Sequence, residues 1–393
     1  MLVKEKVDQA IGILQEYGVD CWITFVRESG MMRDPMMDYL CPADMTWHSA
    51  FIITRSGDTH AIVGQMEKQT VEELGVWGRV TGYVEGIKED LQGFLTTTNP
   101  ESIAVNYSRN SEVCDGLTHG MFLVLEEILS EIGFQDRLTS SEKITSSLKA
   151  RKTATEVARM EKAICHTLDI FDMVTGFIQP GRTEKEIASF MTQEALSRGL
   201  SFGWDPAHCP AVFTGPDTAG AHYQPTDRKV ERGHVLNMDF GLKVQDYTSD
   251  LQRTFFVLEE GETVAPLEVR KGFDTIVAAI ELARAALKPG VQGVEIDGIA
   301  REHIVSQGYE EFPHGLGHQV GRFAHDGTAL LGPAWEQYAN KPFELIEENM
   351  VFTIEPRHMV PGRGVGTIEE MVLVTSDGAE FLSEPQKKLI LIG

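Results

Sequence analysis

Long apolar runs are absent from this sequence: no stretch approaches the roughly 18 to 20 apolar residues that a transmembrane helix needs. The opening segment MLVKEKVDQAIGILQEYGVD carries its apolar residues at helical spacing with charges between them, unlike a signal peptide. We therefore expect neither a membrane span nor a membrane partner.

Cysteine is scarce and unpatterned. The five cysteines are odd in number and never spaced as CxxC, which favours reduced thiols over a disulfide framework or a zinc knuckle. They are Cys21, Cys41, Cys114, Cys165 and Cys209. Scattered single cysteines fit reduced thiols, so a cytoplasmic location is expected.

Basic residues are also few. The chain has 35 Lys and Arg against 59 Asp and Glu, a formal net charge of −24. This charge would repel a phosphate backbone, so nucleic acid is not expected as a partner. The negative charge is explained equally well by solubility, so it does not by itself indicate a function.

The length of 393 residues suits two domains of roughly 100–200 residues each. We place them at 1–145 and 146–393, with the polar stretch TSSEKITSS, residues 139–147, interpreted as the linker. The first domain is expected to be α/β because helical and strand patterns alternate along it. Its predicted strands are CWITFV, IAVNYS and the hairpin AFIITRSGDTHAIV, and its predicted helices are Lys4 to Tyr17, about Gln65 to Leu74, and Met121 to Ile132.

The second domain contains a faint internal repeat. The pattern PGxxxxEI ends in Glu186-Ile187 and again, 109 residues later, in Glu295-Ile296. Thr183 and Glu186 also form a candidate capping box for a helix. Duplication would give a pseudo-symmetric domain with a site between its halves, and chance similarity is the alternative.

Five potential metal ligands in the C-terminal half are the most informative feature. Each lies in a short apolar or glycine-flanked stretch: LNMDFGL, YTSDLQRTFFV, HGLGHQVG, VFTIEP and GTIEEMVLV. They are Asp239, Asp250, His318, Glu355 and Glu369. A carboxylate taken out of water costs several kcal/mol unless a cation or donor compensates it. Four converging carboxylates would therefore require positive charge, which two divalent ions would supply.

Spacing predicts that two antiparallel hairpins carry the carboxylates. Asp239 and Asp250 are eleven residues apart, in strands expected around 235–242 and 248–257. Glu355 and Glu369 are fourteen residues apart, around the turn-rich PGRG of residues 361–364. Oxygen-rich sites with a single nitrogen suit manganese, cobalt, iron or zinc.

Charge also indicates the chemistry. Two dications about 3.5–4 Å apart can share a water and lower its pKa, giving a hydroxide that attacks a carbonyl carbon. A glutamate bound to one metal can take the proton and pass it to the leaving nitrogen. Spare histidines can stabilise the tetrahedral intermediate. No GxSxG motif and no cysteine in an activating setting supports a covalent nucleophile.

These motifs resemble the pita-bread metallopeptidases, the family of Xaa-Pro dipeptidase, aminopeptidase P and methionine aminopeptidase. The family pattern is an Asp in a DFG-like strand, an Asp in a T-x-D strand, the second His of HGxGHxxG, a Glu before Pro, and a Glu in an IE(D/E) strand. The chain matches it in order with Asp239, Asp250, His318, Glu355-Pro356 and Glu369-Glu370. The resemblance covers nearly the whole chain. It implies an α/β creatinase/prolidase-like N-terminal domain and an α+β pita-bread catalytic domain.

The resemblance also implies a role for each ligand. Asp250 and Glu369 would bridge two metal ions, Asp239 would bind one of them, and His318 with Glu355 would bind the other. Glu355 resembles the proton-shuttling glutamate of the family.

Three further histidines match the family pattern. His222, in TGPDTAGAHYQPTDR, and His325, in RFAHDG, match the histidines that contact the substrate carbonyl and the intermediate. His314 opens the HGLGH motif and is expected to shape the pocket.

One departure concerns substrate binding. Prolidase-like members commonly carry Arg two residues before the last glutamate ligand, where this chain has Thr367. Arg357, in EPRHM, or Arg363 is hypothesised to replace that arginine and to bind substrate.

The expected function is dinuclear, metal-dependent hydrolysis of Xaa-Pro bonds in dipeptides or short peptides, with manganese, cobalt or zinc. A homodimer is expected because members of the family are often dimers. Two alternatives stay open. One is a hydrolase of another C–N bond on the same fold, similar to ectoine hydrolase, and the other is a binding module that has lost catalysis.

Overall fold

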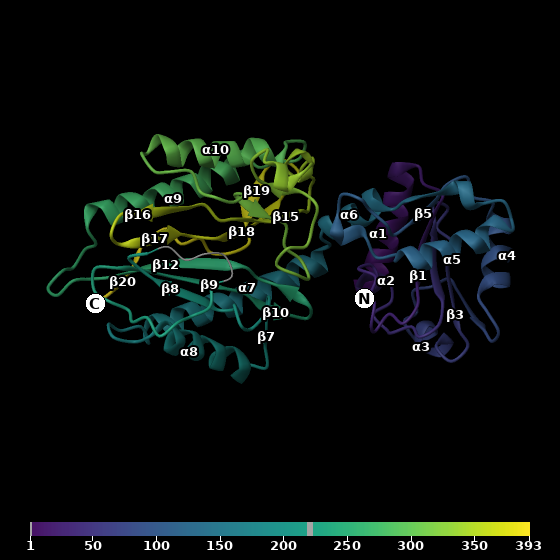
Figure 1. Cartoon of the computed structure of the whole chain (residues 1–393), viewed down its shortest axis with the longest axis horizontal. Helices are drawn as coiled ribbons and strands as arrows, with labels where there is room; N and C mark the ends of the chain where they lie inside the picture. The colour runs from purple at the N-terminus through teal and green to yellow at the C-terminus, as the bar shows by residue number, and fades with distance from the viewer. Residues whose placement is uncertain (1, 218–222) are drawn as a thin grey trace. The chain divides into compact units, whose positions relative to one another are not determined.

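The computed structural model describes residues 2–217 and 223–393, which divide into two compact units, Met1–Lys149 and Ala150–Gly393 (Figure 1).

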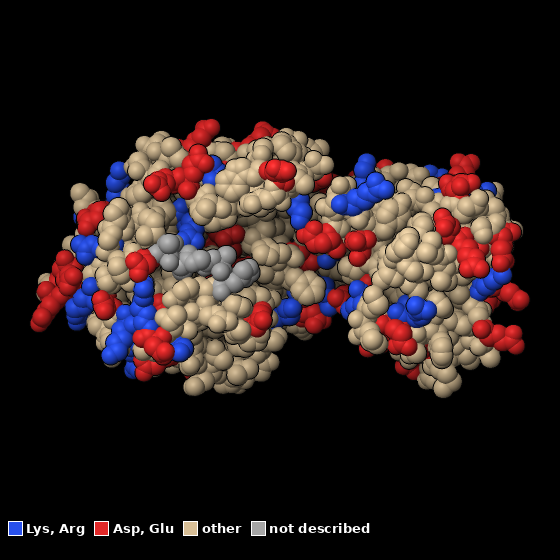
Figure 2. Space-filling view, viewed as in Figure 1, with Lys and Arg blue, Asp and Glu red and all other residues tan. Residues whose placement is uncertain are grey.

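Acidic and basic side chains are interspersed over the visible face of each unit (Figure 2). The net charge of −24 is therefore not gathered into one acidic patch on that face. Among the described residues, no helix is both long and apolar enough to cross a membrane.

The first unit is built on a six-stranded sheet of order β4-β3-β2-β1-β5-β6. Strand β2 runs antiparallel to β1 and β3, and the remaining neighbours are parallel. The strands are β1 (Cys21–Val26), β2 (Ser49–Thr54), β3 (Thr59–Gly64), β4 (Arg79–Tyr83), β5 (Ile103–Val105) and β6 (Leu138–Ser140). The α-helices are α1 (Leu2–Tyr17), α2 (Met37–Leu40), α3 (Lys68–Glu73), α4 (Lys88–Thr98), α5 (His119–Ser130) and α6 (Glu142–Ala150).

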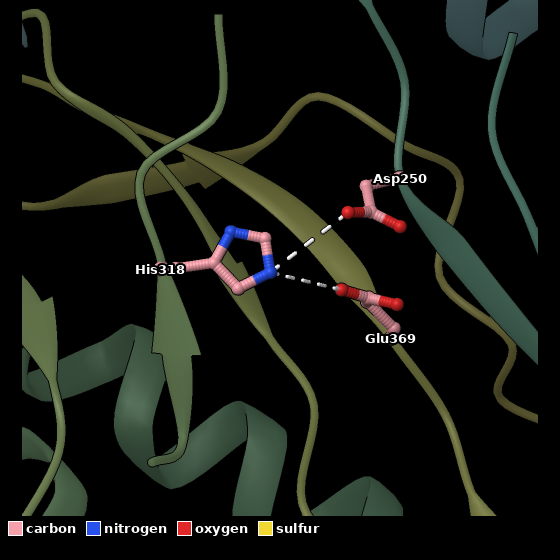
Figure 3. Close-up of side chains that lie close together, drawn as sticks. All are labelled: Asp250, His318 and Glu369. Atoms are coloured by element: carbon pink, nitrogen blue, oxygen red, sulfur yellow. Dashed lines mark ion pairs between the residues drawn. The ribbon is translucent and has the colours of Figure 1, made fainter. Parts of the chain in front are cut away.

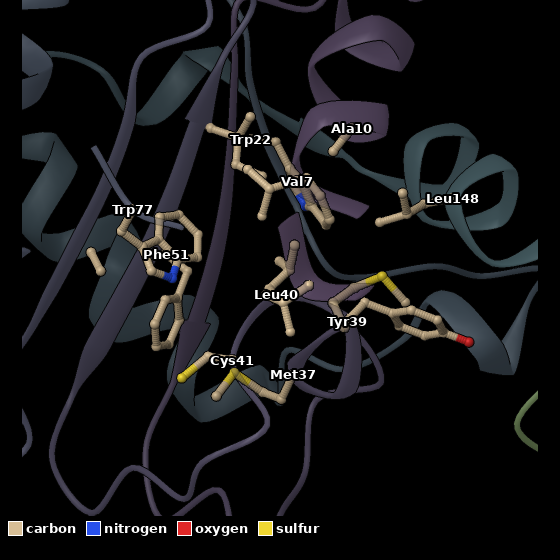
Figure 4. Close-up of a cluster of buried hydrophobic side chains, with 14 of the residues drawn as sticks. Val7, Ala10, Trp22, Met37, Tyr39, Leu40, Cys41, Phe51, Trp77 and Leu148 are labelled. Carbon is tan, nitrogen blue, oxygen red and sulfur yellow. The ribbon is translucent and has the colours of Figure 1, made fainter. Parts of the chain in front are cut away.

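Helices cover both faces of this sheet. Successive side chains of a strand point to opposite faces, and in β1 Trp22 packs in a cluster with Val7 and Ala10 of α1 (Figure 4). Ile23 and Phe25 of the same strand pack in a second cluster with residues of α4 and α5. The α/β prediction for this part of the chain is confirmed.

The interpretation of residues 139–147 as a linker is wrong. These residues complete β6 at the sheet edge and begin α6. Ile144 and Leu148 lie four residues apart on one helix face and enter the hydrophobic core. The hydroxyl of Thr145 donates to the carbonyl of Ser141 at 3.1 Å. The hydroxyl of Ser141 donates to Asn106 Oδ1 at 2.7 Å, so polar side chains of this stretch make hydrogen bonds within the folded unit.

The second unit places its strands between two helix pairs. In Figure 1, α7 and α8 lie on one side of the strands, and α9 and α10 lie on the other. The helices are α7 (Ala154–Thr175), α8 (Glu184–Ser197), α9 (Leu267–Ala286) and α10 (Gly293–Ser306). The strands before α9 are β7 (Ser201–Phe202), β8 (Ala211–Thr214), β9 (Val235–Phe240), β10 (Leu242–Val244), β11 (Tyr247–Thr248) and β12 (Leu251–Val257). The later strands are β13 (Gly317–His318), β14 (Leu330–Leu331), β15 (Val351–Ile354), β16 (Arg357–Val360), β17 (Gly364–Thr367), β18 (Glu370–Val374), β19 (Ala379–Phe381) and β20 (Ile390–Ile392).

The sequence repeat occupies equivalent places in the two helix pairs. The capping box of Thr183 and Glu186 at the start of α8 is confirmed. Gln292 and Glu295 form the same kind of box at the start of α10. Each box begins the second helix of its pair, and each pair precedes one of the two antiparallel hairpins. This arrangement favours duplication over chance similarity.

Candidate active site

The first hairpin carries two of the proposed ligands. Asp239 lies in β9, and Asp250 directly precedes β12, which pairs antiparallel with β9. Gln252 pairs with Asp239 on one side and with Glu369 on the other. Directly paired residues share a face of a sheet, as do residues two apart on one strand. The register therefore brings Asp239, Asp250 and Glu369 to one face.

The second hairpin carries the two glutamates at a break between sheets. Strand β15 pairs with β18, and β16 pairs with β17. The pairs Ile354–Glu370 and Arg357–Thr367 belong to one continuous register, which places Glu355 opposite Glu369. Pro356, which lacks a backbone N–H, follows Glu355 at the break. The predicted turn between the glutamates is confirmed at residues 361–363.

His318 completes the set from β13. Its Nε2 lies 3.4 Å from Glu355 Oε1, 3.8 Å from Asp250 Oδ2 and 3.9 Å from Glu369 Oε1. Figure 3 shows its ring pointing toward the carboxylates of Asp250 and Glu369 from a separate strand. Asp250, His318 and Glu369 each offer one ligand atom, and these three atoms lie within 4.8 Å of one another. The group could therefore hold a metal ion.

The electrostatics of the five residues suit a cation. Burial raises the pKa of Asp239 to about 7. Burial, followed by repulsion from neighbouring carboxylates, raises the pKa of Asp250, Glu355 and Glu369 well above their usual values. Burial lowers the pKa of His318 to about 3, so its neutral imidazole is available as a ligand. The buried Oδ1 of Asp239 has no hydrogen-bond partner among the described residues.

A buried ion pair connects the two hairpins on the face of their strands opposite the proposed ligands. Arg253 lies 3.0 Å from Glu370, and both side chains are almost completely buried. Arg253 also donates to the backbone carbonyls of Gln252 and Glu369. Because a buried guanidinium needs a partner for each donor, this pair ties the two hairpins together directly behind the ligands.

A second ion pair holds the loop that leads to His318. On α10, Asp297 accepts two bonds from Arg301, at 2.7 and 2.8 Å, and a third from Leu316 N–H at 3.0 Å. Arg301 in turn donates to the carbonyl of His314 at 2.8 Å. The HGLGH segment is thus anchored to α10.

The five proposed ligands line a cavity of about 510 Å³, within the usual range for small-ligand sites. His325 lines it, with its ring 4.1 Å from that of His318 and edge-on to it. His314 lines it too, and burial lowers its pKa to about 4. Its remaining wall is largely aromatic and aliphatic: Trp204, Phe213, Tyr223, Leu330 and Tyr338. The expected His222 lies outside the described residues.

The structure distinguishes between Arg357 and Arg363 as the predicted substrate-binding arginine. Half-buried Arg357 lines the cavity, and burial lowers its pKa while Glu355 opposes that shift. Arg363 is not among the cavity residues; it donates to Gly233 O at 3.0 Å and to Glu268 at 3.3 Å. Only Arg357 is therefore placed to meet a substrate bound in this cavity.

Sequence reasoning missed Gln252. Its Nε2 donates to Glu369 Oε2 at 3.0 Å, and its Oε1 accepts from the Thr367 hydroxyl at 3.2 Å. It orients a ligand carboxylate from inside the cavity. The signal was available, since Gln252 follows Asp250 by two residues on the same strand face.

Converging buried carboxylates and a neutral imidazole, set in a cavity, define the site of a metal-dependent hydrolase. The sequence profile of metallopeptidase family M24 matches residues 158–376, more than half of the 393 residues, and the chain belongs to this family. The protein is a metal-dependent peptidase of the pita-bread family.

Known proteins resemble the chain beyond this region. A Xaa-Pro dipeptidase of Pyrococcus furiosus is 31% identical over 249 residues, covering 63% of this chain and 67% of that protein. An X-Pro aminopeptidase structure from Thermotoga maritima has a TM-score of 0.71 and 24% identity, covering 96% of this chain and 99% of that one. A Xaa-Pro dipeptidase structure from Bacillus anthracis has a TM-score of 0.71 and 20% identity, covering 99% and 100%. Both structures share the two-part fold, confirming the fold-class prediction.

Proposed function

We propose that the enzyme hydrolyses Xaa-Pro peptide bonds, acting as a dipeptidase or an aminopeptidase on short peptides. The observation that carries the proposal is the convergence of four carboxylates, two buried and two half-buried, with His318 in one cavity. The Pyrococcus relative, at 31% identity, supports the Xaa-Pro specificity.

The proposed ligand set is Asp239, Asp250, His318, Glu355 and Glu369, holding two divalent ions of manganese, cobalt or zinc. Asp250 and Glu369 are assigned as the shared ligands. Four carboxylates match the charge of two dications. Asp239 Oδ1 has no hydrogen-bond partner among the described residues and is available to coordinate one of the ions. When bound, such ions polarise a carbonyl and lower the pKa of a shared water.

The chain's own residues supply the proton transfers and the positioning. Glu355 accepts the proton of the attacking water and delivers it to the leaving nitrogen, a role that suits its carboxylate, which lines the cavity with Oε1 3.4 Å from Nε2 of His318. His325, with His222, holds the carbonyl oxygen as charge develops on it. His314 shapes the wall of the pocket.

The wider setting is part of the proposal. Residues 1–145 are assigned as the creatinase/prolidase-like domain and 146–393 as the catalytic domain. The enzyme is proposed to act in the cytoplasm, a location that fits its five free thiols. It is further proposed to act as a homodimer, by resemblance to its family, on small peptides and not on nucleic acid or membranes.

A hydrolase of another C–N bond, similar to ectoine hydrolase, is the second candidate. Thr367 favours it, because the arginine common at this position in prolidase-like members is missing. A binding module is disfavoured by the intact ligand set.

A substrate panel tests the proposal. Metal-stripped protein is resupplied with manganese, cobalt or zinc and given Ala-Pro, Met-Pro, a Xaa-Pro-Xaa tripeptide, Ala-Ala and ectoine. Cleavage restricted to the proline peptides supports the proposed function. Cleavage of ectoine alone supports the second candidate and contradicts the first.

A further inference from the structure

We propose that Gln252 and Thr367 hold Glu369 in the orientation in which it binds two ions, and that they thereby set the affinity for the second ion. The hydroxyl of Thr367 orients the amide of Gln252, and this amide fixes the carboxylate of Glu369. The inference rests on the proposed function, in which Glu369 is a shared ligand. It gives a positioning role to Thr367, the residue at which the chain departs from the prolidase-like pattern.

Gln252 meets Glu369 where the two hairpins touch. Two backbone hydrogen bonds join them, since the N–H of each residue donates to the carbonyl of the other at 3.3 Å. Side chains of directly paired residues lie on one face of a sheet. Gln252, Thr367 and Glu369 all line the cavity. The strand pairing therefore places the amide of Gln252 beside the proposed ligand.

The two carboxylate oxygens of Glu369 have different neighbours. Oε2 accepts a hydrogen bond from Gln252 Nε2 at 3.0 Å. Oε1 lies 3.9 Å from Nε2 of His318, and Figure 3 shows it turned toward that ring. Each carboxylate oxygen has two lone pairs, so Oε2 can accept this bond and still bind an ion. Gln252 thus fixes the rotation of the carboxylate and leaves both oxygens available as ligands.

The amide of Gln252 has to point in one direction. Its Nε2 donates and its Oε1 only accepts, so a reversed amide would set Oε1 against the carboxylate of Glu369. The hydroxyl of Thr367 donates to Oε1 at 3.2 Å and so stabilises the orientation that binds Glu369. Without this hydroxyl the amide would hold the carboxylate less firmly.

The first hairpin holds Thr367 in place. Its carbonyl accepts from Nδ2 of Asn237 at 2.7 Å and from the hydroxyl of Thr254, and its N–H donates to the same hydroxyl at 3.2 Å. Asn237 lies in β9 and Thr254 in β12. Because these bonds fix its backbone and its side chain is buried, the hydroxyl stays beside Gln252.

Neither positioning side chain carries a charge. Gln252 and Thr367 therefore hold Glu369 without neutralising it, and its negative charge is left for the ions. A carboxylate that turns away from one ion can keep the other, so loss of the positioning bonds should weaken one of the two ions. Residues that orient metal ligands typically change metal affinity by about 10–100-fold when they are mutated.

Titration of the metal-stripped protein with manganese, followed by calorimetry, measures both affinities. Gln252→Met keeps the length of the side chain and removes the amide, Thr367→Val removes the hydroxyl, and Thr367→Ser retains it. The double variant Gln252→Met/Thr367→Val completes a cycle. Thr275→Val in α9 is the matched control: Thr275 is 5% exposed against 4% for Thr367, and its hydroxyl donates to the carbonyl of Lys271 at 2.8 Å.

Gln252→Met is expected to weaken binding of the second ion by about 10–100-fold, and Thr367→Val by a smaller factor. Thr367→Ser and Thr275→Val should bind both ions as the wild type does. In the Gln252→Met background Thr367→Val should have no further effect, because no amide is left to orient. Electron paramagnetic resonance is a second readout, in which the signal of a coupled manganese pair in the wild type should give way to that of separate ions in Gln252→Met.

Unchanged affinity for both ions in Thr367→Val would overturn the inference, as would a loss of the same size in both backgrounds. Thermal unfolding shows whether each variant folds. If Gln252→Met does not fold, the comparison of Thr367→Val with Thr367→Ser and Thr275→Val decides.

Failure of the proposed function looks different. The wild type then binds two ions and leaves Ala-Pro uncleaved, and the titrations still decide the inference. A wild type that binds fewer than two ions of manganese, cobalt or zinc overturns the shared ligand and the inference together.

Discussion

Burial of Asp239, a proposed metal ligand, makes the stability of the protein depend on pH. Burial raises its pKa from the ordinary value of 3.8 to about 7. Between these values the folded, metal-free protein keeps a proton that the unfolded chain releases. The contribution of Asp239 to stability is therefore fully present below about pH 4 and is lost as the pH rises toward 7.

We accordingly predict that Asp239→Asn stabilises the metal-free protein at pH 8 and has little effect near pH 4. The gain at pH 8 should exceed about 2 °C in Tm, because roughly 1 kcal/mol shifts the Tm of a domain this large by 2–4 °C. Thermal unfolding of metal-stripped protein across this range measures it. The matched control is Asp274→Asn on α9, where the side chain is exposed. A gain that does not depend on pH would contradict the explanation.

Glu355 is predicted to be essential for turnover and not for the fold. Glu355→Gln keeps the size of the side chain and removes the proton acceptor, so kcat should fall by about 10²–10⁴-fold. Steady-state kinetics with Ala-Pro measures the loss. Glu348→Gln, at an exposed position of the same unit, is the control and should retain wild-type activity. Retained turnover in Glu355→Gln would remove Glu355 from the mechanism.

At the scale of residues, the sequence identified the proposed ligands because each stands in a short motif of distinctive composition. It did not identify Gln252, whose importance comes from pairing with Asp239 and Glu369 at once. It also named both Arg357 and Arg363 as replacements for the missing arginine, with Arg357 as the predicted substrate-binding residue. The choice between them depends on the folded hairpin, in which Arg357 lies in β16 and lines the cavity while Arg363 lies in the turn between β16 and β17.

The two hairpins are the elements that build the site, and both were predictable from alternation and turn residues. In the first, the turn residues Gln245 and Asp246 both have positive φ, 48° and 69°, and they join the short strands β10 and β11. The split of the second hairpin at Glu355 and Glu369 was not predictable. Its two halves pair in separate sheets, and at the break Glu369 bridges to Gln252 while Glu355 N–H donates to Leu316 O, both contacts with distant parts of the chain.

The contact between β13 and β15 leads to a prediction for Gly317. A Cβ at Gly317 would lie 2.0 Å from the carbonyl oxygen of Thr353, so Gly317→Ala must push the two strands apart. We expect a loss of about 1–3 kcal/mol in stability, and at least tenfold weaker metal binding because His318 is the next residue. Chemical denaturation and metal titration measure the two effects.

Gly298→Ala in α10 is the matched control for that substitution. No atom lies within 4 Å of a Cβ at this position, and Ala is favoured over Gly inside a helix by about 0.5–1 kcal/mol. A small gain in stability with unchanged metal affinity is expected. Normal metal binding in Gly317→Ala would show that strand spacing does not position His318.

At the scale of the molecule, the catalytic unit joins two similar halves at one site. The first half supplies Asp239 and Asp250, the second supplies His318, Glu355 and Glu369, and the Gln252–Glu369 bridge connects them. The sequence repeat predicted such a pseudo-symmetric arrangement. It could not predict that β12 of one half would pair directly with the hairpin of the other.

Because ligands come from both halves, metal binding should stabilise the unit as a whole. An ion at 100 times its Kd adds about 2.7 kcal/mol to the free energy of unfolding if it binds only the folded protein. Thermal unfolding of the wild type with and without manganese should show this increase. Asp274→Asn should keep the increase and Asp239→Asn should lose much of it. An identical increase in both variants would place the bound metal elsewhere.

The most direct test of the account is to measure metal content and Ala-Pro hydrolysis on the same samples as manganese is returned to the stripped enzyme. Activity is expected to rise with occupancy to a maximum at two ions per chain, and Asp239→Asn is expected to bind fewer ions and to be inactive. Full occupancy without cleavage of any Xaa-Pro peptide, or cleavage by the metal-free enzyme, would contradict it.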